Sequence, residues 1–317
     1  MINRRNFLKG ASIFTIGGLM AGKVGNAEAA TTEANVVKKT VGAKKVIGLQ
    51  TYSLGKELFD DVPGGLKKLK AMGYTTLELA GYNNGKIGSV DMMEFKKMAN
   101  DAGLIITSSH VNPPVREYTQ SNFEQIKDYW KKTAEDHAKL GVKYLVQPGL
   151  PSTRSEEETK FVCEVFNEAG KIVKEHGFPF GYHNHNMEFA RVTPGGKEAV
   201  APFGFGKKEG TAIYDLFLQN TDPALVIFEM DVYWAVMGQA DPVEYLKNNP
   251  TRIKLLHIKD RAVLGQSGMM NFEAIFKQFY ANGYKDYFVE LEGIKSGTQF
   301  EGVKGCCEYL LKAPFVK

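Results

Sequence analysis

Strand-like and helix-like segments alternate along this chain from residue 46 onward, and no other feature constrains the fold as strongly. Short runs rich in β-branched and aromatic residues predict strands at 46–53, 75–81, 104–112, 143–148, 179–185, 225–231, 253–259 and 287–292. Longer periodic segments predict helices at 62–72, 91–102, 122–140, 156–176, 213–220, 241–248, 271–282 and 298–312. Alternating units predict a parallel sheet, and eight of them predict closure. We therefore expect an α/β protein with a single (β/α)8 TIM barrel at 46–317.

Glycines mark the ends of several predicted helices. They are Gly73, Gly103, Gly141, Gly177 and Gly283. A left-handed helix cap favours Gly because Gly has no Cβ. No Gly-x-Gly-x-x-Gly motif follows the first strand, which argues against a dinucleotide-binding fold. Segment 190–211 is rich in Gly, Pro and Lys and predicts a long loop on the face where barrel enzymes carry their active sites.

The N-terminus has the pattern of an export signal. Arg4 and Arg5 precede an apolar run at 11–21 that is too short to span a bilayer, and small residues at a cleavage spacing follow it. We predict a signal peptide at 1–29, a linker at 30–45 and a periplasmic location. The signal is similar to the twin-arginine type. It has Asn where that type favours Ser or Thr, so the general secretory route is the alternative.

Charge and cysteine content narrow the range of partners. Removal of the signal peptide takes away four basic residues and one acidic residue, so the net charge falls from +4 to about +1. This near-neutral charge gives no reason to expect nucleic acid as a partner. Cys163, Cys306 and Cys307 give no disulfide framework, and none of them follows the cleavage site to carry a lipid. We expect no stable membrane anchor, and the oligomeric state stays open.

Polar side chains gather at the C-terminal ends of the predicted strands, where barrel enzymes place their chemistry. These residues are His110, Asn112, Gln147, His183, Asn184, His185, Glu229, Asp231, His257, Lys259, Asp260, Glu290 and Glu292. Asp231, His257 and Glu290 come from three successive strands, and a buried carboxylate needs a partner. We therefore predict that these three residues bind one divalent metal ion, which could be Mn, Co, Zn or Mg.

Other polar residues have simpler interpretations. His137 and His176 lie on predicted outer helices, and we expect both at the surface. Glu229 and Glu292 alternate with other residues on their strands. We expect these two acids to point outward or to pair with Lys or Arg.

Six strand motifs resemble the xylose-isomerase-like family of sugar phosphate isomerases and epimerases, which includes ketose 3-epimerases and inosose dehydratase. The motifs are GLQTYSL, GYTTLELAG, GYHNHNMEF, FEMDVYWA, LLHIKD and YFVELEG, and the likeness covers about 46–314. The ketose epimerases bind their metal through Glu, Asp, His and Glu on strands five to eight. Asp231, His257 and Glu290 match the last three of these ligands. The resemblance implies a metal-dependent enzyme with a small carbohydrate substrate.

The fifth strand departs from the epimerase pattern. His183 stands where those epimerases have Glu, and His185 and Glu188 follow it. His183 and His185 share one side of the strand, so either can bind the metal while the other transfers protons. We predict His185 as the fourth ligand, and His183, Glu188 and Glu290 as catalytic residues. The residues expected to bind substrate are His110, Asn184, Trp234 and Lys259.

The expected chemistry is proton abstraction next to the carbonyl group of a sugar, through an enediolate. Return of the proton on the other face gives an epimerase, and its return at the neighbouring carbon gives an isomerase. Loss of a β-leaving group gives the alternative, a lyase or hydratase acting on keto-sugars or 3-keto-glycosides. Export, and the lack of a visible Gly-rich phosphate cradle after strand seven or eight, favour an unphosphorylated sugar. An endonuclease IV-like enzyme and a non-catalytic sugar-binding protein are remote alternatives, and the first would need a basic DNA-binding face.

Overall fold

The computed structural model of the chain describes residues 45–196, 198–203 and 209–317. The predicted signal peptide lies outside these residues, as does the predicted linker apart from its last residue, so both stay predictions. No described helix is long and apolar enough to cross a membrane. The three cysteines are free, in line with the absence of a predicted disulfide framework, and all three are buried.

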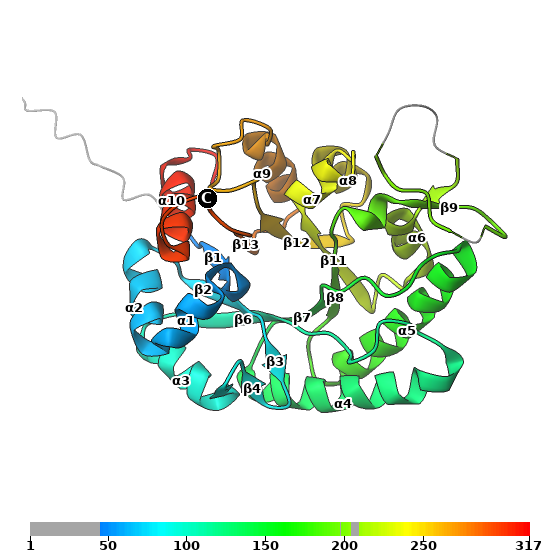
Figure 1. Cartoon of the computed structure of the whole chain (residues 1–317), viewed down its shortest axis with the longest axis horizontal. Coiled ribbons are helices and arrows are strands. Elements are labelled where there is room, and N and C mark those ends of the chain that lie inside the picture. Colours follow the sequence, from blue (N-terminus) through cyan, green and yellow to red (C-terminus); the bar gives the residue numbers. More distant parts are fainter. Residues whose placement is uncertain (1–44, 197, 204–208) are drawn as a thin grey trace, which may run out of the picture. The chain divides into compact units, whose positions relative to one another are not determined.

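Eight parallel strands close into a barrel at the centre of the fold (Figure 1). Their order around the barrel is β1, β13, β12, β11, β8, β7, β6 and β2, and each neighbouring pair is parallel. Their bounds are β1 Gly48–Gln50, β2 Thr76–Leu79, β6 Ile105–His110, β7 Tyr144–Gln147, β8 Phe180–His183, β11 Val226–Asp231, β12 Ile253–Ile258 and β13 Tyr287–Val289. This closed ring confirms the predicted single (β/α)8 TIM barrel.

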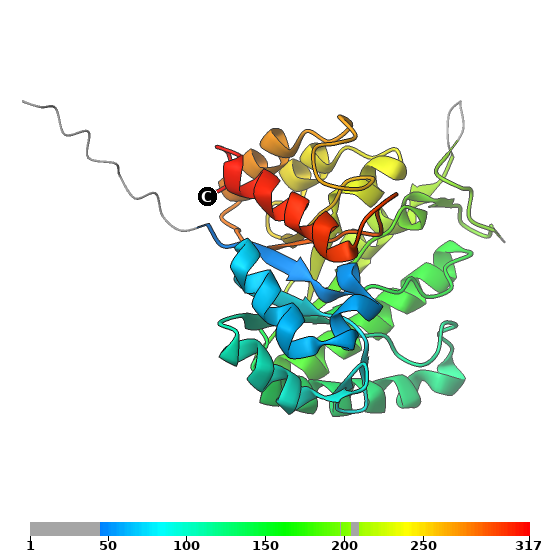
Figure 2. The ribbon, with the colours of Figure 1, turned by 60° about the vertical axis from the view of Figure 1, so that its left-hand side comes forward.

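Helices surround the barrel (Figure 1). Their bounds are α1 Lys56–Asp60, α2 Val62–Met72, α3 Met92–Asp101, α4 Phe123–Leu140, α5 Glu156–Glu175, α6 Ile213–Asn220, α7 Val232–Met237, α8 Pro242–Asn248, α9 Phe272–Ala281 and α10 Gln299–Lys312. All eight predicted helices are present, and each begins and ends within one residue of its predicted range. The last helix closes the outer ring, because α10 packs beside α2 (Figure 2). Next to this contact, the Tyr74 hydroxyl donates to the Val303 carbonyl oxygen over 2.7 Å.

Short elements that the sequence pattern did not reveal lie near the strand ends. Helix α7 follows β11 directly, and its β-branched and aromatic composition resembles that of a strand. The 3-10 helix η1 Thr51–Leu54 replaces the predicted end of the first strand. Two-residue strands form two small antiparallel sheets, with bounds β3 Tyr82–Asn83, β4 Lys86–Ile87, β5 Val90–Asp91, β9 Arg191–Val192 and β10 Thr211–Ala212. The remaining 3-10 helices are η2 Gln120–Asn122 and η3 Met187–Phe189.

Side chains inside the barrel change from apolar to polar along the strand direction. The apolar end is a small buried cluster of Val146, Ile227, Leu255 and Phe288. Every second residue of a strand faces the same way, so Glu229 and Asp231 follow Ile227 into the interior. The same step leads from Leu255 to His257. The polar residues therefore collect beyond an apolar floor, at the C-terminal ends of the strands.

The five predicted cap glycines all have positive φ angles, and Gly141 offers a clean test of their role. Its φ is 75°, and a Cβ there would have no other heavy atom nearer than 3.9 Å, so only the backbone conformation opposes a side chain. We expect Gly141→Ala to lower the free energy of unfolding by about 1 kcal/mol in urea titrations. Gly293→Ala is the control, because a Cβ there meets no atom within 4 Å and φ is not in the left-handed region. An equal loss in both variants contradicts this account.

Candidate active site

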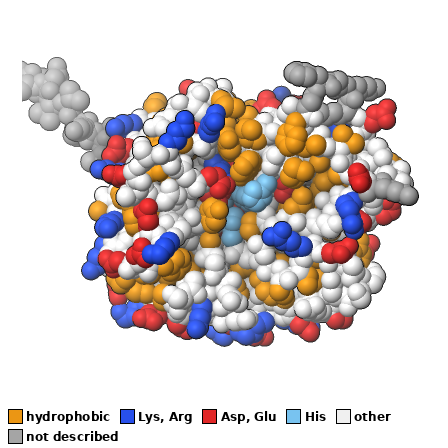
Figure 3. Space-filling view, in the orientation of Figure 1, with side chains coloured by type: hydrophobic (Ala, Val, Ile, Leu, Met, Phe, Trp, Pro, Cys, Tyr) orange, Lys and Arg blue, Asp and Glu red, His pale blue; other side chains and the backbone are white. Residues whose placement is uncertain are grey.

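Two groups of ligand-type side chains lie at the C-terminal end of the barrel interior and share His257. The mouth group consists of His183, Asp231, His257 and Glu290, and the inner group consists of Glu78, His110, Glu229 and His257. Within each group the ligand atoms lie within 4.8 Å of one another, and all these residues are buried. In the space-filling view, histidine side chains are visible at the centre of this face (Figure 3).

The mouth group is built from the ends of four neighbouring strands, β8, β11, β12 and β13. His257 Nδ1 lies 3.1 Å from Glu290 Oε2, and His183 Nε2 lies 3.6 Å from Asp231 Oδ2. The other oxygen of Asp231, Oδ1, accepts a hydrogen bond of 2.9 Å from the Trp234 backbone at the start of α7. This cap fixes the Asp231 carboxylate and leaves Oδ2 facing the imidazole.

Several buried atoms of the mouth group have no hydrogen-bond partner within the described part of the chain. They are both ring nitrogens of His183 and Oδ2 of Asp231. Burial lowers the pKa of His183 well below its usual value, with His257 and His110 adding to the effect, so the ring is neutral and offers a lone pair. Burial raises the pKa of Asp231 to about 6 although Lys259 opposes it. An imidazole lone pair beside a carboxylate oxygen that accepts no hydrogen bond suits a divalent cation.

Lys259 supplies a fixed positive charge next to this group. Its side chain is fully buried, and Nζ lies 3.0 Å from Glu290 Oε2 and 3.7 Å from Asp231 Oδ2, and donates to Glu292 Oε1. Burial lowers the pKa of the ammonium group, but the three carboxylates outweigh it and raise the pKa. Burial likewise raises the pKa of Glu290, but His257 and Lys259 outweigh it and hold the pKa well below its usual value. The contact with Glu292 confirms the prediction that this acid pairs with Lys or Arg.

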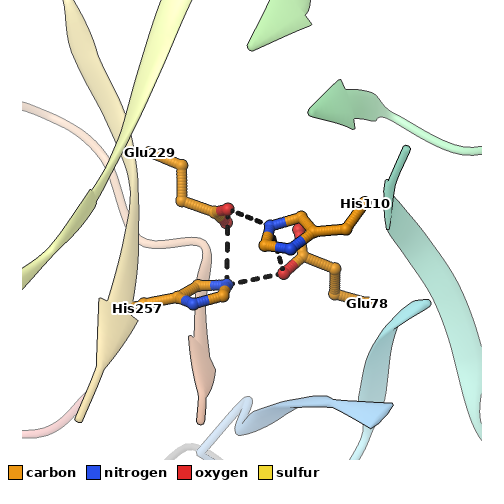
Figure 4. A group of neighbouring side chains, drawn as sticks. All are labelled: Glu78, His110, Glu229 and His257. Carbon is orange, nitrogen blue, oxygen red and sulfur yellow. Dashed lines mark hydrogen bonds and ion pairs between the residues drawn. The ribbon is translucent and has the colours of Figure 1, made fainter. Parts of the chain in front are cut away.

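The inner group is a ring in which imidazole nitrogens alternate with carboxylate oxygens (Figure 4). His110 Nε2 lies 2.7 Å from Glu229 Oε2 and 3.2 Å from Glu78 Oε2. His257 Nε2 lies 2.6 Å from Glu78 Oε2 and 3.3 Å from Glu229 Oε2. Burial and the neighbouring Glu78 raise the pKa of Glu229 to about 7. Burial also raises the pKa of Glu78, but the two histidines outweigh it and lower the pKa.

Glu78 is a site residue that the sequence interpretation missed. A carboxylate inside the apolar run TLEL of the second strand was the available signal, because a buried carboxylate needs partners. Gln50 Nε2 donates to its Oε2 over 2.8 Å and Ser108 Oγ donates to its Oε1 over 2.6 Å. The prediction that Glu229 points outward or pairs with Lys or Arg is wrong. Glu229 is fully buried and pairs with histidines, because it lies two positions before the inward-facing Asp231 on the same strand.

The three residues of the fifth strand that were predicted as metal ligand or catalytic groups lie in different positions. β8 ends at His183, which belongs to the mouth group, whereas His185, the predicted fourth ligand, belongs to neither group of described residues. His185 lies just beyond the strand, with its ring centre 5.0 Å from that of His183, and burial lowers its pKa to about 4. Glu188 belongs to neither group: it is fully buried and accepts hydrogen bonds from the Tyr182 hydroxyl and the His185 backbone. Tyr182 alternates with His183 on the strand, so Glu188 lies away from the barrel mouth.

The four residues predicted to bind substrate also differ in position. His110 borders the mouth cavity and is 9% exposed. Asn184 is fully buried, and its side chain contacts the backbone N and O of Asp231 at 3.1 and 3.3 Å. Trp234 is half-buried, with its ring centre 5.0 Å from Lys259 Nζ. The burial of Asn184 and Lys259 favours roles in holding the carboxylates over direct contact with substrate.

A cavity of about 350 Å³ opens at the mouth group. Its lining includes Tyr52, His110, Asn112, His183, His185 and Glu290. This volume lies in the range of small-molecule sites, about 300–1,000 Å³. A larger cavity of about 670 Å³ lies between the loops that follow β12 and β13, but it contains no member of either group. The convergent polar groups therefore place the site at the smaller cavity.

The prediction that His137 lies at the surface is wrong. The side chain is fully buried between α4 and β6, where Nδ1 lies 2.7 Å from the Thr133 carbonyl oxygen and Nε2 lies 2.9 Å from Ser109 Oγ. His137 follows Trp130 and Thr133 on the inward face of α4, at helical spacing. Burial lowers its pKa to about 4, so it is a neutral packing residue. His176, at the end of α5, is half-buried.

The chain is similar to several sugar-processing barrels. The sequence model of the xylose isomerase-like TIM barrel family matches residues 66–305. A solved sugar phosphate isomerase/epimerase from Parabacteroides distasonis is 58% identical with a TM-score of 0.81, covering 86% of this chain and 100% of the other. Inosose dehydratase of Clostridium perfringens is 27% identical over 183 residues, 50% of this chain and 54% of that relative, so the chain spans about half the relative's length. The 3-keto-D-glucoside 4-epimerase of E. coli, at 18% identity, shares the fold with a TM-score of 0.65, over 85% of this chain and 100% of the epimerase.

Proposed function

We propose that this chain, which belongs to the xylose isomerase-like TIM barrel family, is a metal-dependent isomerase or epimerase of unphosphorylated sugars. The observation that carries the proposal is the mouth group. There a neutral His183 faces an oxygen of Asp231 that accepts no hydrogen bond, beside His257 Nδ1 and Glu290 and at the edge of a cavity. When bound, a divalent metal would polarise a sugar carbonyl and acidify the neighbouring C–H group. Mixed nitrogen and oxygen ligands suit Mn, Co, Zn and Mg without selecting one of them.

His185 is the residue that we propose to carry the proton. It lines the cavity, it is half-buried, and its lowered pKa keeps the imidazole neutral at pH 7, with a lone pair that can accept a proton. Glu290 is a poor base, because its carboxylate already accepts hydrogen bonds from His257 and Lys259. Lys259 holds the carboxylates of Glu290 and Glu292 in place through its contacts with both. In this arrangement His183 binds the cation and His185 takes the proton and returns it to the neighbouring carbon in an isomerisation. An epimerisation would need a second group to return a proton on the opposite face.

The start of α10 supports an unphosphorylated substrate. In barrel enzymes a phosphate often binds at a helix N-terminus near the last two strands. Here Glu57 accepts hydrogen bonds from the backbone N–H groups of Gln299 and Phe300 at 2.9 and 3.2 Å. Thr298 and Glu301 form a capping box that uses two further N–H groups. Because carboxylate oxygens already accept from three of these donors and a hydroxyl accepts from the fourth, a phosphate would meet negative charge there.

Two matched substitutions test the assignment of roles on the fifth strand. We expect His183→Gln to lose the mouth cation, and His185→Gln to keep it while turnover falls by about 10²–10⁴-fold. Metal content by elemental analysis separates the two variants. Turnover in deuterated water supplies the second readout, because His185→Gln should also lose deuterium incorporation into product.

The substrate for this test comes from a panel of free sugars, keto-sugars and 3-keto-glycosides. Full turnover and full deuterium incorporation in His185→Gln contradict the proposed base. If the wild-type enzyme forms product that carries the substrate's own hydrogen and no solvent deuterium, a hydride shift replaces proton abstraction.

A lyase or hydratase acting on keto-sugars or 3-keto-glycosides is the second candidate, and His183 favours it. An epimerase of the two-glutamate type needs matched carboxylate bases, and this chain has an imidazole at one of those positions. The C. perfringens relative is, by name, a dehydratase. An unsaturated product in NMR spectra of the same incubations supports the lyase, and an epimer or isomer supports the first proposal.

A further inference from the structure

The inner group has the dimensions of a second cation site. Its four ligand atoms form a ring with successive edges of 2.7, 3.3, 2.6 and 3.2 Å. A divalent ion bound at about 2.1 Å holds ligands at right angles about 3.0 Å apart, whereas tetrahedral ligands lie about 3.4 Å apart. The mean edge of the ring is about 3.0 Å, which matches the spacing of neighbouring ligands around such an ion.

Hydrogen bonds alone leave this ring incompletely satisfied. Each Nε2 carries at most one hydrogen and can therefore donate only one strong hydrogen bond. The two short edges, of 2.7 and 2.6 Å, can be these hydrogen bonds, and the two longer edges, of 3.3 and 3.2 Å, then lack a well-placed hydrogen. Glu229 Oε1 is buried and has no hydrogen-bond partner among the described residues. A divalent ion uses all four edges, and any proton on either Nε2 atom leaves to solvent or moves to Nδ1 when the ion binds.

The residues around the ring hold it in position. Glu78 is fixed by Gln50 and Ser108, which is the kind of second hydrogen-bond layer that orients metal ligands. His257 faces both groups, with Nδ1 toward Glu290 and Nε2 toward Glu78 and Glu229. One imidazole thus lies between the two candidate positions.

We propose that the inner group binds a second divalent cation through Glu78, His110, Glu229 and Nε2 of His257, next to the cation of the mouth group. The inner cation fixes the His257 ring and so aims Nδ1 at the mouth group. Its binding does not depend on the proposed reaction, because none of the steps assigned to His185 passes through the inner group.

Metal stoichiometry tests the second site directly. Chelated protein is dialysed against Mn²⁺ and its metal content is measured by elemental analysis. We expect two ions per chain in the wild type, one in Glu229→Gln, one in Asp231→Asn and none in the double variant. Asp60→Asn, which changes an exposed acid paired with Lys56, is the control and should keep both ions.

The outcomes separate this proposal from the proposed function. A single ion that Asp231→Asn removes and Glu229→Gln keeps overturns the inner site and leaves the mouth site intact. A single ion with the reverse behaviour supports the inner site and contradicts the metal-dependent function. Since Glu229→Gln removes a buried charge and can impair folding, wild-type crystals soaked in Mn²⁺ provide a second measurement. An anomalous peak between the Nε2 atoms of His110 and His257 supports the inner site, and a peak at the mouth group alone overturns it.

A spectroscopic signature follows from the shared imidazole. With both ring protons released to solvent, His257 would bridge two Mn²⁺ ions as an imidazolate, and the ions should couple magnetically and broaden the EPR spectrum. Either single variant should restore the resolved hyperfine lines of an isolated ion. An uncoupled spectrum in the fully loaded wild type contradicts the bridged arrangement.

Discussion

Asp231→Asn is expected to remove the mouth cation and to lower turnover by more than about 100-fold, while the fold stays intact. Loss of residues that only support a metal ligand already costs about 10–100-fold, so loss of a ligand charge should cost more. The substitution keeps an oxygen that can accept the hydrogen bond from the Trp234 backbone, so the cap of α7 survives. Metal content, turnover and thermal unfolding measure the three parts of this expectation.

Asp241→Asn is the matched control for that variant. Asp241 also caps a helix, because its Oδ1 accepts hydrogen bonds from the backbone of Val243 and Glu244 at the start of α8, but it is exposed and belongs to neither group. It should keep its metal content and turnover. If Asp231→Asn also retains full metal content, the mouth group is not the metal site.

The strand and helix periodicities predicted the barrel because the main signals are local. Apolar runs, helical spacing and cap glycines such as Gly141 each depend on a few neighbouring residues, and the closed ring follows from their repetition. The sequence pattern did not predict helix α7, because Asp231 and the residues after it also suit a strand. Its helical start depends on a side-chain cap that only the three-dimensional structure displays.

The site was predictable where one strand end carries an unusual residue, as at Asp231 and His257. It was less predictable where the direction of a side chain decides its role. Glu78 and Glu229 lie inside strands, and only the common inward face of Ile227, Glu229 and Asp231 places Glu229 beside histidines from other strands. Such long-range pairings have no signature in a single sequence, although an isolated acidic residue in an apolar strand indicates that a buried partner exists.

Lys259→Met is expected to lower the free energy of unfolding of the metal-free protein by about 3–5 kcal/mol, because it leaves buried carboxylates without their positive partner. Lys259 is fully buried and contacts Glu290, Glu292 and Asp231, and Met preserves most of its length while removing the charge. Urea unfolding measures the loss. Saturating Mn²⁺ should recover part of this lost stability, since a cation in the mouth group supplies positive charge to Asp231 and Glu290.

The exposed Lys247→Met is the control and should change the free energy of unfolding by less than about 0.5 kcal/mol. A loss of similar size in both variants, or no effect of Mn²⁺ on Lys259→Met, would show that the ammonium does not balance the charge of a cation site.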